Sequence, residues 1–196
     1  MFVGQFKKLT SRIFPDKFLQ LLPRVGLTAN RLTFLSLLCT LGAAYLFWQG
    51  EIVWGGLLAL LDWIFDMFDG RVARLQQRDN KLGAFFDFFS DRIRLIWLVA
   101  LAFGSVIPFQ LAIIALLLDA LLFLFSSFIE LKKLKHPNWL PANIDLITVG
   151  AIVNQIPIFI YIKLVIGSLL LVLQVITALA MNRNNQPVKS QVGATD

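Results

Sequence analysis

Long apolar segments are the feature of this sequence that most restricts its possible folds. A helix that crosses a bilayer needs about 20 mainly apolar residues. Six stretches come close to that length, at residues 31–49, 52–73, 83–104, 108–131, 144–161 and 164–182. Only 15% of the 196 residues are charged, whereas soluble domains carry about 25% charged residues. The sequence therefore predicts an all-α integral membrane protein, a bundle of six transmembrane helices in one domain.

The fifth and sixth segments are the hardest to separate. Pro157 and Lys163 are the only interruptions of the apolar stretch that they form. With so few interruptions, five spans instead of six is the alternative count. The turn at Gly50 and Glu51 and the turn at residues 104–108 are clearer, because glycine and proline mark turns.

The basic residues predict the orientation of the bundle. Of the 18 Lys and Arg residues, all except Lys163 lie before the first span, around the second loop, after the fourth span or after the sixth. With six spans, these places share one side of the membrane. Because Lys and Arg concentrate in cytoplasmic loops, we expect both termini and the second loop to be cytoplasmic. We expect a multi-pass protein of a bacterial- or archaeal-type cytoplasmic membrane.

The segment 1–30 alternates large apolar residues with Lys and Arg. This pattern is typical of an amphipathic helix that lies in the lipid headgroup plane, here broken near Pro15. A loosely ordered basic tail is the alternative. The segment lacks the apolar run and small-residue cleavage site of a signal peptide. The sequence thus predicts a juxtamembrane segment at 1–30, a transmembrane domain at 31–182, and a polar tail at 183–196 that we expect to be disordered.

The net charge of +6 suggests contact with anionic lipid. No basic stripe is interleaved with exposed aromatic residues, so nucleic acid is not an expected partner. The single cysteine, Cys39, excludes an intrachain disulfide. Membrane lipid is the partner that the composition predicts.

Aspartates interrupt the apolar pattern on both sides of the second loop. On a helix, Asp62, Asp66 and Asp69 share one face, and Gly83, Asp87 and Asp91 share a face on the next span. A turn at residues 75–82 would bring the two faces together. Unpaired carboxylates in or near a membrane are costly, so these acids need a partner.

A divalent cation is one partner that would remove this cost. Carboxylate oxygens are hard ligands that suit Mg²⁺ or Mn²⁺. Four acids from two helices, Asp66, Asp69, Asp87 and Asp91, would hold two metal ions, and two-metal sites suit displacement at phosphorus. The alternative is that each acid pairs with Arg71, Arg74, Arg92 or Arg94. For a single aspartate the arginine pairing is the better interpretation, but four acids in register favour the metal site.

Small residues accompany the acids. Gly70 follows Asp69, Ala73 lies one turn later, and Gly83 opens the next segment. Glycine costs about 1 kcal/mol in a helix interior, so these positions need a reason. A flat ligand lying against the backbone is one reason, and helix–helix packing is the other. Arg74 is placed either to meet a phosphate or to pair with an acid.

These residues resemble the signature of the CDP-alcohol phosphotransferase (CDP-alcohol phosphatidyltransferase) family. The match reads D-x-x-D-G-x-x-A-R from Asp66 to Arg74, then eight residues, then G-x-x-x-D-x-x-x-D from Gly83 to Asp91. The segment from Gly26 to Thr33 also resembles the family's entry to the first span, usually G-[IL]-T-P-N-x-[IL]-T, although Ala29 replaces the proline. The resemblance is specific over residues 26–94.

The resemblance implies a phospholipid-synthesis enzyme of lipid metabolism. Such a transferase moves a substituted phosphate from a CDP-linked lipid, such as CDP-diacylglycerol, to the hydroxyl of a polar alcohol and releases CMP. It implies that Asp66, Asp69, Asp87 and Asp91 bind two Mg²⁺ or Mn²⁺ ions, and that Asp91 is the catalytic base. Asp66 and Asp69 would also face the nucleotide, together with Asn30, Thr33, Gly70, Ala73, Arg74 and Gly83. A homodimer is expected from the resemblance alone.

The acceptor is less well defined. The stretch Asp87-Phe-Phe-Ser-Asp91-Arg92, preceded by Gly-Ala-Phe-Phe, leans toward the family branches that use inositol phosphate or a related polyol. Those branches often carry an arginine-rich stretch near the fifth span, which is missing here, and glycerol 3-phosphate is the alternative acceptor. Lys132, Lys133 and Lys135 would hold an acceptor phosphate, or else they simply contact cytoplasmic lipid.

A cation transporter is the competing class of function, with the acids lining an ion path. Inverted repeats and broken central helices would favour it, and the sequence shows neither. Asp62 lies one turn deeper than the metal motif and would support a neighbouring ligand or the nucleotide. Asp119, near the middle of the fourth span, is either functional or paired with another helix.

Overall fold

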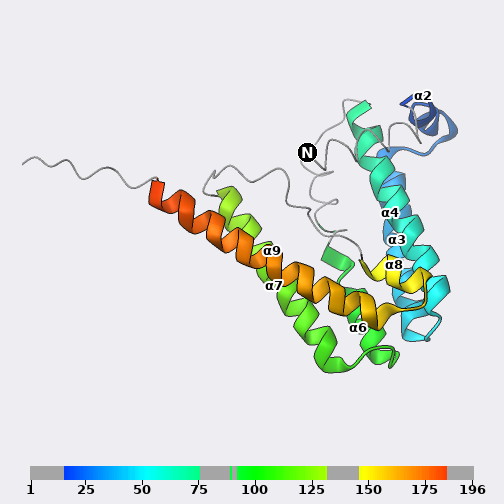
Figure 1. Ribbon diagram of the computed structural model, residues 1–196. Helices are drawn as coiled ribbons and strands as arrows, with labels where there is room; N and C mark the ends of the chain where they lie inside the picture. The colour runs from blue at the N-terminus through cyan, green and yellow to red at the C-terminus, as the bar shows by residue number, and fades with distance from the viewer. Residues whose placement is uncertain (1–15, 76–88, 90–91, 132–145, 185–196) are drawn as a thin grey trace, which may run out of the picture.

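The computed structural model describes residues 16–75, 89, 92–131 and 146–184, and over these residues every regular element is a helix (Figure 1). In chain order the elements are α2 (Asp16–Leu19), the 3₁₀ helix η1 (Leu22–Val25), α3 (Ala29–Trp48), α4 (Ile52–Leu75), α6 (Ile96–Phe103), α7 (Phe109–Leu131), α8 (Leu146–Ile152) and α9 (Ile156–Asn184). The predicted all-α class is confirmed for this part of the chain.

Helices α3 and α4 form a tight antiparallel hairpin. The turn between them contains Gly50, whose φ of +79° suits glycine because it has no Cβ. Gly55 of α4 lies so close to α3 that an added Cβ would stand 2.6 Å from the ring of Phe47. Small residues let the two backbones approach, as is common between membrane helices. The hairpin places the start of α3 beside the end of α4.

The remaining helices form a second group beside this hairpin. The long helices α7 and α9 run side by side, and the shorter α6 and α8 lie between them and the hairpin (Figure 1). Gly104 ends α6 against the end of α3, where a Cβ would lie 2.4 Å from the carbonyl oxygen of Phe47. Gly56 of α4 packs in the same way on α8. These close approaches fix α6 and α8 relative to the hairpin.

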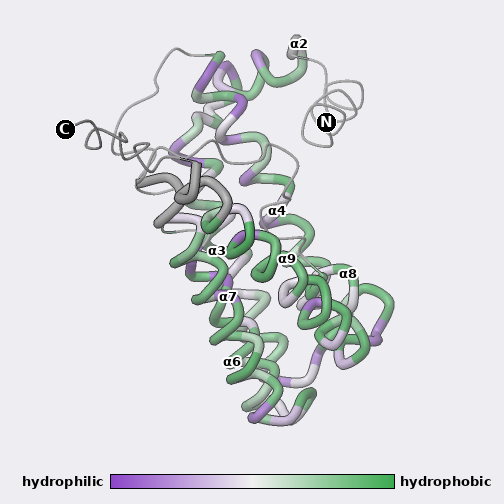
Figure 2. The backbone as a smooth tube through the Cα atoms, turned by 60° about the vertical axis from the view of Figure 1, so that its left-hand side comes forward, coloured by the Kyte–Doolittle hydropathy of each residue, from purple (hydrophilic) through white to green (hydrophobic). Residues whose placement is uncertain are grey.

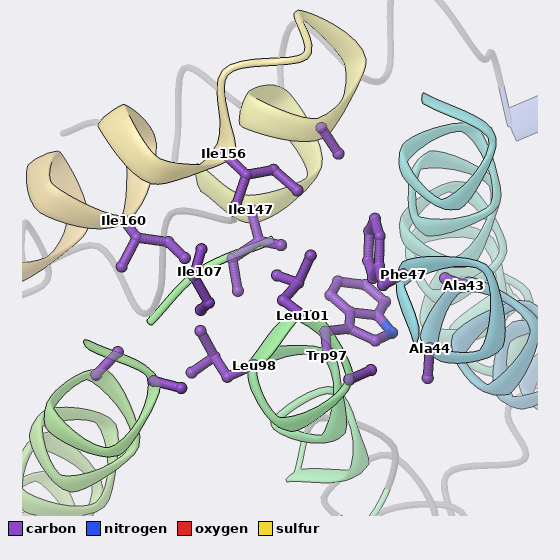
Figure 3. Close-up of a cluster of buried hydrophobic side chains, with 14 of the residues drawn as sticks. Ala43, Ala44, Phe47, Trp97, Leu98, Leu101, Ile107, Ile147, Ile156 and Ile160 are labelled. Atoms are coloured by element: carbon purple, nitrogen blue, oxygen red, sulfur yellow. The ribbon is translucent and has the colours of Figure 1, made fainter. Parts of the chain in front are cut away.

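The main apolar core lies where these helices meet. Figure 3 shows Trp97 and Leu101 of α6 between Phe47 of α3 and the isoleucines of α8 and α9. Trp97 is 1% exposed, and its ring meets that of Phe47 edge to face at 6.1 Å. Its indole N–H donates to the carbonyl oxygen of Thr40 at 2.9 Å. Since a buried indole needs such an acceptor, Trp97 fixes the position of α6 along the axis of α3.

A smaller apolar cluster joins the N-terminal segment to the hairpin. Leu19 of α2 is fully buried against Leu32 of α3 and against Phe68 and Val72 of α4. Phe18 meets Phe68 edge to face at 6.3 Å. The end of the predicted segment 1–30 therefore packs on the bundle. Its amphipathic helix at the membrane surface stays a prediction, because residues 1–15 lie outside the part that the structure describes.

Within the described ranges, three helices are long and apolar enough to cross a membrane, namely α3, α7 over Phe109–Ser127 and α9 over Ile156–Leu179. They indicate an integral membrane protein. Hydrophilic residues gather at the end of the bundle where α3 begins and α4 ends, while the helix middles are mostly hydrophobic (Figure 2). The third predicted span is described only in part and contains α6, and the fifth is divided between α8 and the start of α9. The six-span count and the cytoplasmic termini stay predictions.

The boundary between the last two predicted spans differs from the sequence-based one. The helix breaks at residues 153–155, where Asn154 has a φ of 55°, a conformation that asparagine tolerates better than most residues. Pro157 lies in the first turn of α9, where its missing N–H costs nothing. Lys163 lies inside α9 because its ammonium pairs with Asp119 of α7 at 3.0 Å. Neither predicted interruption ends the helix.

Candidate functional site

The acidic face of α4 forms as predicted. Asp62, Asp66 and Asp69 lie on a continuous helix, Ile52–Leu75, and all three point into the structure to some degree. Asp62 is fully buried, Asp69 is 5% exposed, and the Asp66 side chain is 23% exposed. Buried carboxylates need charged or hydrogen-bonding partners, and each of the three has a polar partner in the structure.

Asp69 is held from α3. The Thr33 hydroxyl donates to Asp69 Oδ2 at 2.6 Å, and the carbonyl oxygen of Ala29 lies 3.1 Å from the same hydroxyl as a second acceptor. A hydroxyl has one proton to donate, and a carboxylate is the stronger acceptor. The structure thus brings together two residues, Thr33 and Asp69, that the sequence placed in one nucleotide site.

Asp62 is the centre of a second, deeper set of contacts. The Ser36 hydroxyl of α3 donates to Asp62 Oδ1 at 2.5 Å. Arg94 donates from Nε to Asp62 Oδ2 at 2.7 Å, and its Nη2 lies 3.4 Å from Oδ1. The same Nη2 pairs with Asp66 Oδ1 at 3.2 Å. Arg94 therefore bridges two carboxylates that stand one turn apart on α4.

The backbone position of Arg94 is fixed by the start of α6. Its carbonyl oxygen accepts the N–H of Trp97 at 3.0 Å. Trp97 is in turn anchored on α3 by its indole, as described above. The Arg94 side chain is 19% exposed, and its guanidinium contacts both the buried Asp62 and the more accessible Asp66.

Gly70 and Arg74 continue the same end of α4. A Cβ on Gly70 would have the Arg74 guanidinium at 3.6 Å as its nearest neighbour, an ordinary van der Waals distance. Packing within the described structure therefore does not require glycine here. Arg74 is exposed and Ala73 is half-buried. Packing against the segment after residue 75 lies outside the described residues, so helix–helix packing and space for a ligand both stay open as explanations of Gly70.

The start of α3 lies beside these residues. Thr28 is the N-cap residue, and Ala29 is the first residue of the helix. Proline is favoured at that first position because the N–H has no helical partner, so Ala29 occupies a position that would also suit the family's usual proline. Asn30 is exposed at the same end, one turn before Thr33.

Several predicted site residues lie outside the part that the structure describes. They are Gly83, Asp87, Asp91, Lys132, Lys133 and Lys135. Their predicted roles therefore remain predictions. Within the described ranges, no group of three or more His, Cys, Asp or Glu side chains is placed to hold a metal ion. This agrees with the contacts of Asp62, whose carboxylate meets Arg94 and Ser36.

The donor set of the described residues fits half of a divalent metal site. Asp66 and Asp69 present hard oxygen ligands one turn apart, and contacts from Arg94 and Thr33 orient them. Ligating carboxylates in metal sites are usually held by such outer hydrogen bonds. Completing a site for Mg²⁺ or Mn²⁺ requires donors from elsewhere, for which Asp87 and Asp91 are the candidates in the sequence.

Two residues that contact the acids, Ser36 and Arg94, were not among the predicted site residues. Ser36 follows Thr33 by three residues and precedes Thr40 by four, and that helical spacing of hydroxyls was the available signal. Arg94 was one of four arginines considered as partners for the acids. The fold shows its contact, because the segment that leads into α6 brings it to the level of Asp62.

Comparison with known proteins gives consistent matches. The family model for CDP-alcohol phosphatidyltransferase matches residues 26–181. Phosphatidylinositol phosphate synthases of Corynebacterium glutamicum and Mycobacteroides abscessus are 34% and 33% identical over 46% and 42% of this chain. An archaetidylinositol phosphate synthase of Pyrococcus horikoshii is 29% identical over 49% of it. These alignments cover 42%, 41% and 52% of the respective relatives, about half their length or less.

Solved structures share the fold. Mycobacterium tuberculosis phosphatidylinositol phosphate synthase in complex with manganese and citrate superposes with a TM-score of 0.71 at 20% identity, over 91% of this chain and 92% of that one. The same enzyme with CDP-DAG bound gives 0.70 at 20% identity, over 91% and 98%. The family model covers well over half of the sequence, and it includes the acidic face of α4 and the start of α3. The chain therefore belongs to the CDP-alcohol phosphatidyltransferase family.

Proposed function

We propose that this protein is a phospholipid-synthesis enzyme. It transfers a phosphatidyl group from a CDP-linked lipid, such as CDP-diacylglycerol, to the hydroxyl of a polar alcohol and releases CMP. The observation that carries the proposal is the arrangement at the end of α4, where Thr33 holds Asp69 and where, among the described residues, Gly70 has only an ordinary contact with Arg74. That arrangement lies within a chain of this family, and the related M. tuberculosis fold was solved with CDP-DAG bound.

The proposed donor site combines a charged residue for the phosphates, small residues for the nucleotide and apolar surfaces for the lipid tails. Arg74 is exposed at the end of α4, where its guanidinium can pair with a phosphate. Gly70, Ala73 and Asn30 leave room for the nucleotide, with Gly83 on the next segment. The lipid tails lie along apolar helix surfaces, because α3 exposes Phe34, Leu38 and Leu41. The nucleotide therefore binds at the polar end of the bundle, which we place at the cytoplasmic face.

Two divalent ions, Mg²⁺ or Mn²⁺, are the proposed cofactors. When bound, they would offset negative charge on the pyrophosphate and on the departing CMP. Asp66 and Asp69 supply carboxylates from α4, and Asp87 and Asp91 supply the rest. The manganese complex of the M. tuberculosis protein supports this choice of metal.

Asp91 is the proposed general base. It accepts the proton of the acceptor hydroxyl while that oxygen forms a bond to the phosphatidyl phosphorus. The bond from this phosphorus to the CMP oxygen breaks, and CMP leaves with the electron pair. Arg74 remains paired with the phosphate that carries the new negative charge.

Inositol phosphate is the acceptor best supported by the relatives. Two are named phosphatidylinositol phosphate synthases and one an archaetidylinositol phosphate synthase. The Asp87-to-Arg92 stretch leans the same way. Lys132, Lys133 and Lys135 are the candidate contacts for its phosphate. Glycerol 3-phosphate remains the alternative acceptor.

The test measures CMP release by the purified protein. CDP-diacylglycerol and Mg²⁺ or Mn²⁺ are supplied with inositol phosphate, inositol, glycerol 3-phosphate or serine, with chelator and donor-free reactions as controls. Metal-dependent CMP release with inositol phosphate above the other acceptors is expected. Preference for glycerol 3-phosphate would replace the acceptor assignment. Absence of CMP release with every acceptor would refute the enzyme and favour a transporter or a non-catalytic protein.

A further inference from the structure

We propose that Arg94 is a positioning residue for the catalytic centre. It holds the carboxylate of Asp66 in the orientation that a divalent metal requires, and it is itself held by Asp62. This inference rests on the proposed function, because it assigns Asp66 to a metal site. It adds two residues, Arg94 and Asp62, that lie outside the signature running from Asp66 to Asp91.

The first step concerns charge. Asp62 is fully buried near the middle of α4, where an unpaired acid would be costly. Its contacts to Ser36 and Arg94, at 2.5 and 2.7 Å, compensate this burial. Asp62 in turn neutralises Arg94. The pair therefore places a guanidinium next to Asp66 with little net positive charge to repel a metal ion.

The second step concerns geometry. Nε and Nη2 of Arg94 both face Asp62, so the planar guanidinium is fixed against one carboxylate. In that pose Nη2 also reaches Asp66 Oδ1 at 3.2 Å. A lysine ammonium lacks this planar fork and cannot reproduce the two-pronged contact. The orientation of Asp66 thus depends on the contact between Arg94 and Asp62, which lies one turn earlier on α4.

The third step concerns rigidity. Arg94 stands three residues before Trp97, which is buried and bonded to the backbone of α3 at 2.9 Å. Ser36, also on α3, holds the other side of Asp62. Three separate segments, α3, α4 and the start of α6, therefore converge on one carboxylate pair. Precise placement of this kind is what a metal ligand needs.

The test uses Mn²⁺ binding, which does not need turnover. Purified protein in lipid nanodiscs is titrated with Mn²⁺, and the free ion is followed by electron paramagnetic resonance. The variants are Arg94→Lys, Arg94→Met and the double variant Asp62→Asn with Arg94→Gln. The double variant removes both charges of the Asp62–Arg94 pair together, so we expect it to fold even where Arg94→Met leaves Asp62 unpaired and fails. Arg24→Met is the matched control, because Arg24 is exposed in η1 and distant in sequence from the acids.

We expect the Kd for Mn²⁺ to rise at least tenfold in the double variant, within the 10- to 100-fold range of outer-contact losses in metal sites. The increase in log Kd for Mn²⁺ in Arg94→Lys should be more than half of the increase seen in the double variant. The Mn²⁺ concentration for half-maximal CMP release should rise in parallel, with the KM for the donor within threefold of wild type. Arg24→Met should match wild type in every measurement.

An Mn²⁺ Kd within twofold of wild type in the double variant would overturn the inference. Tighter binding would also overturn it, because Arg94 would then act only as a repelling charge. Absence of Mn²⁺ binding in the wild type would overturn both this inference and the proposed metal site. Tight wild-type Mn²⁺ binding without CMP release would contradict the proposed function alone, because the Kd comparison judges Arg94 without turnover.

Discussion

Replacing Gly70 by alanine separates the two reasons for a glycine at that position. Among the described residues, the atom nearest to an added Cβ would be Arg74 Nη1 at 3.6 Å, which is ordinary contact. Alanine is favoured over glycine in a helix by about 0.8–1 kcal/mol. The structure therefore predicts that Gly70→Ala stabilises the metal-free protein by up to about 1 kcal/mol, or roughly 2–4 °C in Tm for a chain of this size.

The same methyl group should damage activity. If a nucleotide lies against the backbone at Gly70, the methyl occupies that space and weakens donor binding by tenfold or more. Thermal unfolding of the metal-free protein and binding of CDP-diacylglycerol are measured side by side. Gly56→Ala is the contrasting control, because its Cβ would lie 2.7 Å from the Ala151 Cβ and 3.0 Å from the backbone nitrogen of Ile152. Overpacking of that kind costs about 1–3 kcal/mol.

The expected pattern is a stabilised but poorly binding Gly70→Ala protein and a destabilised Gly56→Ala protein. A Gly70→Ala variant that gains stability and binds donor as well as wild type would refute the assignment of this residue to the nucleotide. Loss of stability in Gly70→Ala would instead show that glycine is needed for packing, against the space seen in the structure.

Further predictions follow from the polar contacts. Thr33→Val removes the hydroxyl that holds Asp69 at 2.6 Å, so Mn²⁺ binding should weaken about tenfold, equal to ~1.4 kcal/mol. Thr33→Ser keeps a hydroxyl and should restore the binding. An unchanged Kd for Mn²⁺ in Thr33→Val would contradict this role. Asp119→Asn leaves Lys163 unpaired between α7 and α9 and should destabilise the protein by about 3 kcal/mol in thermal unfolding. The double variant Asp119→Leu with Lys163→Met should regain most of that stability, and equal losses in the single and double variants would show that the ion pair is not the cause.

Much of the fold could be predicted because the relevant signals are local. The helical spacing of Asp62, Asp66 and Asp69 is a property of α4 alone, and the structure confirms it. The turn at Gly50 was visible for the same reason, since a left-handed glycine is needed there. Family membership also followed from a contiguous motif, residues 66–91.

Features that depend on contacts between distant segments were harder to predict. Lys163 resembled an interruption between two spans, but a partner 44 positions earlier in the chain lets it lie inside α9. Arg94 was one of four equivalent arginines in the sequence, and the structure shows its contacts with Asp62 and Asp66. Asp62 was assigned a supporting role, and the structure identifies Ser36 and Arg94 as its partners.

The central claim is that the acids of α4 belong to a site that splits a CDP-linked lipid. The most direct measurement is the yield of CMP and of new phospholipid, quantified together by mass spectrometry, from CDP-diacylglycerol, inositol phosphate and Mn²⁺. We predict equal amounts of the two products from wild type, and at least a hundredfold lower yield of both from Asp69→Asn at unchanged expression and folding. Wild-type yield of both products from Asp69→Asn, or no product from the wild type, would contradict the account.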